Sequence, residues 1–190
     1  MSIRILAVVG SLRAGSYNRQ LAEAAVKYAP EGTDVQVFDG LAEVPFYNED
    51  LDLPGEVPGS VPAPAQALRD AVARADALLL ITPEYNGTIP AALKNAIDWT
   101  SRPYGAGAIT GKPAGVIGTA GGHYGGAWAH EDTRKSARGA GAQVLDDIVL
   151  DIPLSAERFA ARHPADDEEV AAAMSAVLGK LIAAVAAMGR

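Results

Sequence analysis

The first residues that could do chemistry form a short polar turn near the N-terminus. The turn reads Gly10-Ser11-Leu12-Arg13-Ala14-Gly15-Ser16-Tyr17-Asn18. A helical pattern follows at once, with Ser16 in the position of its N-cap. The N–H groups at the start of that helix and the hydroxyls of Ser11 and Ser16 would donate toward one anion. The amide of Asn18 and the guanidinium of Arg13 would add to them. The turn therefore predicts a cup for a phosphate group.

This turn does not match the two best-known phosphate-binding motifs. Gly10 and Gly15 have the spacing of a Walker A loop, but Ser16 and Tyr17 stand where Lys and Ser or Thr should follow. The turn is not a dinucleotide G-x-G-x-x-G either. Taken alone, it is equally compatible with an ordinary capped turn, so a second feature is needed to distinguish a phosphate site from such a turn.

That second feature is a longer motif that follows the third apolar run. It reads Thr82-Pro83-Glu84-Tyr85-Asn86-Gly87-Thr88-Ile89-Pro90-Ala91-Ala92-Leu93-Lys94-Asn95-Ala96-Ile97-Asp98-Trp99. Its prolines and its Asn-Gly pair force a turn, and Pro90 is suited to the first position of the next helix. Such a bend presents backbone N–H groups and an aromatic face. Because open parallel sheets bind ligands beyond the carboxyl ends of their strands, this turn is a second candidate for the same site.

Apolar runs and helical patterns alternate along the chain. Short runs rich in β-branched residues predict buried strands at residues 3–9, 35–38, 77–82, 114–119 and 144–150. Apolar residues at helical spacing predict helices around residues 21–28, 68–75, 93–97, 127–141 and 174–185. Because each crossover between parallel strands packs a helix onto the sheet, this pattern predicts a parallel sheet covered on both faces. The pattern alone leaves the strand order open.

Two irregular stretches interrupt this alternation. Residues 39–64 contain five prolines and residues 101–112 contain three glycines, so both are predicted to be long surface loops. Long loops in a compact domain are often functional, although composition alone slightly favours a tolerated insertion.

Composition and charge exclude several classes of function. The chain has 190 residues, 49% of them hydrophobic, which fits a single domain spanning residues 1–190. Lys and Arg number 16 against 23 Asp and Glu, a formal charge of −7, so we expect no general affinity for nucleic acid or anionic membranes. The absence of cysteine excludes disulfides, thiolate nucleophiles and Cys-ligated metal centres. Redox chemistry would therefore need a bound cofactor.

The remaining residues argue against metal and hydrolytic chemistry. His123, His130 and His163 are the only histidines, and their spacing fits no two-His zinc motif, so no metal site is expected. Ser11 does not lie in G-x-S-x-G, which disfavours serine hydrolysis. The N-terminal segment has neither the layout of a signal peptide nor the length of a transmembrane helix. A soluble cytoplasmic protein is the expectation.

Together, the two motifs resemble those of the NADPH-dependent FMN reductase family, which includes chromate and quinone reductases. The resemblance rests on Gly-Ser-Leu-Arg…Ser-x-Asn and Pro-Glu-Tyr-Asn-Gly…Pro…Leu-Lys-Asn-Ala-Ile-Asp-Trp, and it covers the chain from about Ile3 to Leu150. It implies a flavodoxin-like three-layer sandwich in which a five-stranded parallel sheet has the order 2-1-3-4-5 and helices on both faces. In that order the ligand lies beyond strands one and three, which the two motifs follow.

The resemblance also implies which residues bind FMN. Those around the phosphate would be Ser11, Arg13, Ser16, Tyr17 and Asn18, and those along the isoalloxazine ring would be Pro83, Glu84, Tyr85, Asn86 and Gly87. A third loop, Thr119-Ala120-Gly121-Gly122-His123-Tyr124-Gly125-Gly126, resembles the family's small-residue ring contact and adds Thr119, Gly121 and Gly122. The family usually has a serine-rich stretch at this place, and the chain departs from that pattern at His123 and Tyr124.

The implied activity is electron transfer through bound flavin. Hydride would pass from NADPH or NADH to FMN and on to a small-molecule acceptor such as free FMN or a quinone, so the cofactor would supply the chemistry and no catalytic acid or base is expected. The alternatives are an FMN electron carrier without NAD(P)H turnover and a module with an empty site. The resemblance further implies a homodimer or homotetramer with residues 91–99 and 102–104 near the contact. Ile97 and Trp99 would then be either contact residues or core residues.

Overall fold

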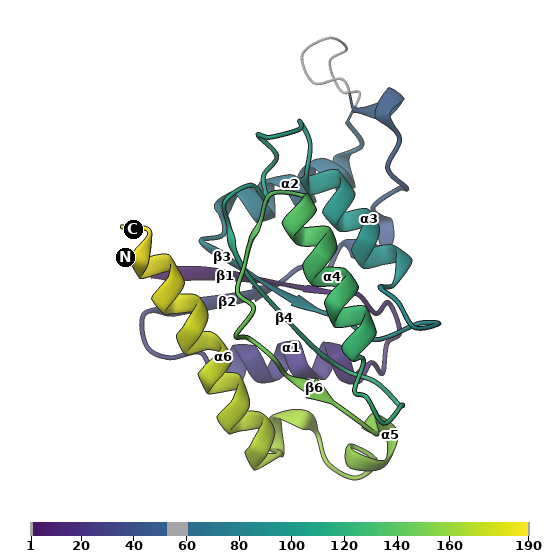
Figure 1. The fold of residues 1–190 in the computed structure, drawn as a ribbon, viewed down its shortest axis with the longest axis vertical. Helices are drawn as coiled ribbons and strands as arrows, with labels where there is room; N and C mark the ends of the chain where they lie inside the picture. The colour runs from purple at the N-terminus through teal and green to yellow at the C-terminus, as the bar shows by residue number, and fades with distance from the viewer. Residues whose placement is uncertain (1, 53–60, 190) are drawn as a thin grey trace.

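A parallel β-sheet runs through the middle of the molecule (Figure 1). The computed structural model describes residues 2–52 and 61–189. Its strands are β1 (Ile3–Val9), β2 (Thr33–Val37), β3 (Ala77–Ile81), β4 (Pro113–Thr119), β5 (Gln143–Val144) and β6 (Asp151–Ile152). The first five lie in the order β2-β1-β3-β4-β5, and β6 pairs with β4. All pairs are parallel, which confirms the flavodoxin-like arrangement.

Helices cover both faces of this sheet (Figure 1). One face carries α1 (Tyr17–Lys27) and α6 (Glu168–Ala187), and the other carries α2 (Ala63–Arg74), α3 (Ala91–Thr100) and α4 (Ala127–Gly139). Successive side chains of a strand point to opposite faces. In β1, Ile5, Ala7 and Val9 therefore join the core beneath α1 and α6, whereas Leu6 and Val8 join the core beneath α2 and α3. Burial on both faces explains why residues 5–9 of the strand form a continuous apolar run.

The predicted surface loop at residues 39–64 contains short helical turns. It includes the 3-10 helices η1 (Leu41–Glu43) and η2 (Glu49–Leu51) before α2 begins at Ala63, and residues 53–60 lie outside the described part of the chain. Side chains of α3 hold this segment: Asn95 Nδ2 donates to Pro45 O (2.9 Å), and Trp99 Nε1 donates to the same oxygen (2.7 Å). Farther along are α5 (Ser155–Arg158) and the 3-10 helix η3 (Pro164–Asp166). The stretch 101–112 consists of turns, as predicted.

The prediction of a continuous fifth strand at residues 144–150 was wrong. In this stretch only the short strands β5 and β6 pair with β4, and between them the chain turns, with Ile148 N donating to Leu145 O (3.1 Å). Arg134 of α4 bridges the gap, because its Nη2 donates to Val116 O (3.3 Å) and to Ile148 O (3.1 Å). Asp146 and Asp147 interrupt the apolar run at this turn, so the sequence carried a signal for the break. The donor that bridges it comes from another element and could not be recognised from this stretch alone.

Helix α6 belongs to the core. By length and composition, with a mean hydropathy of 2.0, it is the one helix among the described residues that could cross a membrane, a test that core helices also pass. Its apolar side packs with α1 and the sheet in one cluster. The buried side chains are Val170, Met174, Val177, Leu178, Leu181 and Val185. The helical spacing predicted for this segment is therefore the spacing of a core-facing stripe.

Candidate functional site

Three loops meet at the carboxyl ends of β1, β3 and β4. Strand β3 lies between the other two, with Val9 opposite Ile81 and Ile81 opposite Ile117. The register continues past these pairs, since Gly10 N donates to Ile81 O (2.8 Å) and Thr82 N donates to Ile117 O (3.0 Å). The loops that start at residues 10, 82 and 119 therefore leave one edge of the sheet side by side. We call them the first, second and third loops.

The first loop leaves several donors free for an anion. Ser16 caps α1, as predicted, and its hydroxyl oxygen accepts from Arg19 N (3.4 Å). The next two N–H groups, of Tyr17 and Asn18, have no partner among the described residues. The exposed guanidinium of Arg13 lies 5.7 Å from the ring centre of Tyr17 and has no carboxylate partner in the described part of the chain. A free cation beside free helix-start N–H groups suits a phosphate.

Asn18 also connects two of the loops. Its buried amide binds the backbone of Thr119, with Nδ2 donating to the carbonyl oxygen (2.9 Å) and Oδ1 accepting from the N–H (3.0 Å). An amide nitrogen carries two hydrogens, so one donor of Asn18 remains for a ligand. The side chain therefore ties the start of α1 to the end of β4, a role that its position in the sequence did not indicate.

The second loop contains a tight turn. Tyr85 and Thr88 exchange two backbone hydrogen bonds of 3.2 Å each, and the residues between them have positive φ, 53° at Asn86 and 75° at Gly87. Positive φ at both central positions defines a two-residue hairpin turn for which Asn-Gly is the preferred pair. A Cβ at Gly87 would lie 3.5 Å from the ring of Trp128. The turn therefore has a fixed shape and presents the half-exposed Tyr85 side chain.

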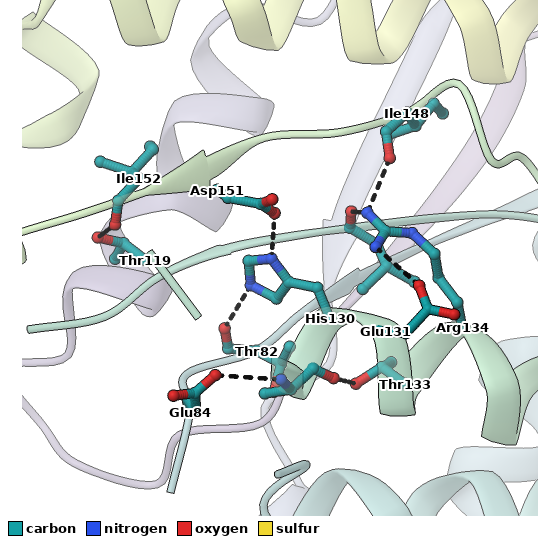
Figure 2. Close-up of polar contacts among 12 residues, drawn as sticks. Thr82, Glu84, Thr119, His130, Glu131, Thr133, Arg134, Ile148, Asp151 and Ile152 are labelled. Atoms are coloured by element: carbon teal, nitrogen blue, oxygen red, sulfur yellow. Dashed lines mark hydrogen bonds and ion pairs between the residues drawn. The ribbon is translucent and has the colours of Figure 1, made fainter. Parts of the chain in front are cut away.

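The second loop is tied to the start of α4. Glu84 Oε2 accepts from Ala129 N (3.2 Å) (Figure 2). This carboxylate supplies the cap that Gly126, at the N-cap position, does not provide, and it lies where the helix dipole favours negative charge. Thr88 Oγ1 adds a hydrogen bond of 2.5 Å to Asp132 Oδ2 of the same helix. Glu84 is part of the second loop, which the resemblance places along the ring, and its carboxylate points to α4.

The third loop combines an open backbone with exposed aromatic rings. Thr119 is buried at the end of β4. Gly121 and Gly122 are exposed, and a Cβ at either position would meet nothing within 4 Å. Tyr124 and Trp128 are 70% and 60% exposed, and their ring centres lie 5.7 Å apart. A planar ligand could therefore approach the backbone closely beside these two rings.

Beneath the loops, His130 of α4 is fully buried between two oxygen atoms (Figure 2). Its Nδ1 forms a hydrogen bond with the carboxylate of Asp151, at the start of β6. Its Nε2 lies 3.2 Å from Thr82 O, where β3 passes into the second loop. The hydrogen bond with His130 lowers the pKa of the Asp151 carboxyl, against the opposing effect of burial.

Comparison with known proteins agrees with this geometry. The family model described as NADPH-dependent FMN reductase matches residues 3–156, which include all three loops. The chain belongs to the NADPH-dependent FMN reductase family. Flavin-dependent NAD(P)H oxidoreduction, with FMN and NAD(P)H as cofactors, is therefore its activity, as the motifs predicted. No finding supports the alternative of an electron carrier without NAD(P)H turnover.

Several characterised proteins are similar to this FMN reductase family member. A 2-hydroxy-1,4-benzoquinone reductase of a Burkholderia species is 42% identical over 134 residues, which are 70% of this chain and 69% of that protein. An NAD(P)H-dependent FMN reductase of Pseudomonas aeruginosa is 39% identical over 134 residues, with the same coverage of 70% and 69%. The solved structure of FerB, an NAD(P)H:(acceptor) oxidoreductase of Paracoccus denitrificans, is 32% identical with a TM-score of 0.82, and the match covers 96% of this chain and 97% of that one.

The sequence motifs of this FMN reductase family member indicated the three loops but not the residues beneath them. A Cβ at Gly118 would lie 2.0 Å from Thr82 O and 2.5 Å from His130 Nε2, so the contact between β3, β4 and α4 requires glycine there. One feature could have indicated that His130 is buried, because it shares the buried face of a polar helix with Ala129 and Thr133. No feature of the sequence indicated a role for Asp151, since a polar residue after an apolar run is common.

Proposed function

We propose that residues 1–190 form a single FMN-binding domain that reduces quinones with electrons from NAD(P)H. The observation that carries this proposal is the convergence, at one sheet edge, of the free donors of the first loop and the rigid turn of the second. The residues proposed to bind FMN are Ser11, Arg13, Ser16, Tyr17, Asn18, Pro83, Glu84, Tyr85, Asn86, Gly87, Thr119, Gly121 and Gly122.

The first loop fits the terminal phosphate of FMN. The free N–H groups of Tyr17 and Asn18 lie at the positive end of the α1 dipole. Arg13 adds a full positive charge in a chain whose formal charge is −7. FAD carries a bridging pyrophosphate and an adenosine, for which this short cup has no matching donors. We therefore expect FMN to bind in preference to FAD.

The second and third loops fit the two sides of a planar ring. The Tyr85–Thr88 turn is rigid, and the bare backbone at Gly121 and Gly122 permits close approach. When bound, FMN supplies the electron transfer between NAD(P)H and the acceptor. The chain's own part is to hold the ring and to present N–H groups that stabilise negative charge on it. We assign no residue as a general acid or base.

A quinone is the acceptor that the exposed surface beside the site favours. Tyr124 and Trp128 present two exposed rings next to the second loop, and aromatic faces stack on planar conjugated molecules. Relatives from a Burkholderia species and from Pseudomonas putida, each 42% identical to this chain, are named quinone reductases. These relatives support the assignment of a quinone as the substrate.

We also propose a cytoplasmic homodimer, or a dimer of dimers. Ile97 and Trp99, which the sequence offered as contact or core residues, are buried within the subunit and are core residues. Phe46 and Tyr104, which are 79% and 88% exposed, are better candidates for the contact. Large exposed aromatic side chains are typical of protein interfaces. A monomeric mass by light scattering at micromolar concentration would refute the dimer.

One set of measurements tests the proposed function. The purified protein is titrated with FMN and with FAD while flavin fluorescence is followed. NADPH and NADH oxidation are then recorded with 1,4-benzoquinone, with free FMN and without an acceptor. We expect FMN to bind more tightly than FAD and the quinone to accelerate NAD(P)H oxidation. Equal or tighter binding of FAD would overturn the phosphate assignment, and turnover that no quinone accelerates would overturn the substrate assignment.

A further inference from the structure

His130 lies between the starts of two loops. Its Nε2 is 3.2 Å from Thr82 O, at the start of the second loop (Figure 2). The same nitrogen lies close to the backbone on both sides of the third loop, because a Cβ would be 2.5 Å from it at Gly118 and 3.2 Å from it at Gly126. The imidazole therefore fills the space between the second and third loops.

Neither hydrogen-bond partner of the His130 ring can donate a hydrogen. Thr82 O is a carbonyl oxygen, and the lowered pKa of Asp151 keeps that carboxylate ionised at neutral pH. The nearby charge of Arg134 also favours the ionised carboxylate. A neutral imidazole has a single N–H and would leave two acceptors facing each other. Two donating ring nitrogens would satisfy both acceptors, and Asp151 is placed to compensate the charge of such a ring.

His163 provides a contrast within the same chain. Its Nδ1 accepts from Ala165 N (3.1 Å), and its Nε2 donates to Glu23 Oε2 (3.0 Å). One nitrogen accepts and the other donates, which is the pattern of a neutral ring. His163 is partly exposed at the N-cap of η3, and its hydrogen-bond partners, Ala165 and Glu23, lie outside the three loops. It is therefore a matched control, because it is also a histidine bonded to a carboxylate.

We propose that His130 is a positioning residue for the flavin ring, which ties the second loop to the third as a buried cation fixed by Asp151. Asp151 belongs to β6, so the pair also anchors both loops to the sheet. This inference rests on the proposed FMN site. His130 acts on the two loops that flank the ring, and among the described residues its ring forms hydrogen bonds only with Asp151 and Thr82, not with the first loop. Loss of the His130 side chain should consequently lower the affinity for FMN and the affinity for riboflavin, which lacks the phosphate, by the same factor.

The protonation of His130 can be measured directly. In protein labelled with 15N-histidine, we expect the NMR signals of His130 to show hydrogens on both ring nitrogens at neutral pH, and those of His163 to show one hydrogen. The spectra of His130→Gln and His163→Gln assign the signals. A His130 ring with a single N–H would overturn the inference.

The positioning role is tested with His130→Gln and Asp151→Asn, using His163→Gln as the control. Asp151→Asn preserves the side-chain shape, so it keeps the test available if His130→Gln does not fold. FMN and riboflavin affinities are measured by fluorescence titration well below each melting temperature. We expect both variants to lose about tenfold in affinity for each ligand, equivalent to about 1.4 kcal/mol. The control should bind both ligands like the wild type.

The outcomes separate this inference from the function on which it rests. If the wild type does not bind FMN, the proposed function fails and this inference fails with it. If the wild type binds FMN and the folded variants retain both affinities, only the positioning role of His130 is overturned. A loss confined to FMN would also overturn it, because the effect would then act through the phosphate.

Discussion

The side chain of Asn18 and the backbone of Thr119 bind each other in both directions, with hydrogen bonds of 2.9 and 3.0 Å between positions 101 residues apart. The start of α1 therefore cannot move independently of the end of β4. These elements carry the first and third loops, so one buried amide sets the distance between the proposed phosphate cup and one side of the proposed ring site.

Replacing Asn18 with Asp should loosen this connection. The substitution keeps the shape but places an oxygen opposite Thr119 O, where Nδ2 now donates. Leaving a buried acceptor unpaired costs about 1–3 kcal/mol, and each kcal/mol lowers the melting temperature of a chain of this size by about 2–4 °C. Thermal unfolding followed by circular dichroism measures the change. Asn48→Asp is the control, because within the described part of the chain the Asn48 side chain only accepts a hydrogen bond, from Asp50 N (3.0 Å), and Asp accepts it equally well. Equal stability of the two variants would contradict the role of Asn18.

Replacing Arg13 with Ala should weaken FMN binding while leaving riboflavin binding unchanged. A charge-assisted hydrogen bond contributes about 1.5–3 kcal/mol, so the affinity for FMN should fall by roughly ten- to a hundredfold. The remaining helix-start donors contribute only about 0.3–1 kcal/mol and should not mask the loss. Isothermal titration of both ligands measures the difference. An unchanged FMN affinity would refute the phosphate cup.

Gly118 and Gly121 should respond very differently to replacement by Ala. A Cβ at Gly118 would lie 2.0 Å from Thr82 O and 2.5 Å from His130 Nε2, whereas a Cβ at Gly121 would meet nothing within 4 Å. Because the nearest atom is backbone, β3 or β4 must shift, and we expect Gly118→Ala to cost about 3 kcal/mol or more. Gly121→Ala should unfold like the wild type. Denaturant titration of both variants makes the comparison, and a fully stable Gly118→Ala protein would count against the close contact.

The buried pair of Asp52 and Arg69 predicts a pH dependence of stability. The two hydrogen bonds from Arg69, of 2.7 and 2.6 Å, lower the pKa of the Asp52 carboxyl against the opposing effect of burial. A carboxyl whose pKa is lower in the folded state stabilises the fold above its unfolded pKa of about 3.9, and this stabilisation is lost as the pH falls through the folded pKa. The contribution should therefore be constant from neutral pH to about pH 5, begin to fall near pH 4 and be lost once the pH lies below the folded pKa.

Asp52→Asn tests this dependence. At neutral pH, removal of the charge should destabilise the fold by about 3 kcal/mol, because Arg69 is left as a buried cation without its partner. The difference in stability between this variant and the wild type should narrow as the pH falls below about 4. Asp146→Asn is the control, because Asp146 forms an exposed ion pair with Arg138 that contributes little. Melting temperatures across this pH range provide the measurement, and a constant difference at every pH would argue against the assignment.

Trp128→Ala should impair the use of quinones. Aromatic stacking contributes about 0.5–1.5 kcal/mol, so KM for 1,4-benzoquinone should rise about two- to tenfold with little change in kcat. Steady-state oxidation of NADPH measures both constants. Val149→Ala removes another exposed apolar side chain and should leave them unchanged. If KM for free FMN as the acceptor rises by the same factor, the substitution has disturbed the second loop in general, because Trp128 packs against this loop at Gly87.

The sequence by itself determined the features that depend on neighbouring residues. The continuous apolar run at residues 5–9 reflects a strand buried on both faces, Ser16 caps the helix that it precedes, and Asn86-Gly87 forms the turn that this pair prefers. Pro90 shows the limit of such reasoning, because it occupies the N-cap of α3, one position before the predicted one. The motif pair also predicted the family, the fold and the dependence on FMN and NAD(P)H, which the comparisons confirmed.

Tertiary structure alone decided the features that join distant residues. The two-way bond between Asn18 and Thr119, the bridge made by Arg134 across the interrupted fifth strand, and the burial of His130 against Asp151 all join separate elements. A local pattern records the neighbours of a residue along the chain, and hydrogen-bond partners in these cases are brought together only when the helices pack on the sheet. For the same reason, Ile97 and Trp99 could be recognised as core residues only after α3 was placed against its neighbours.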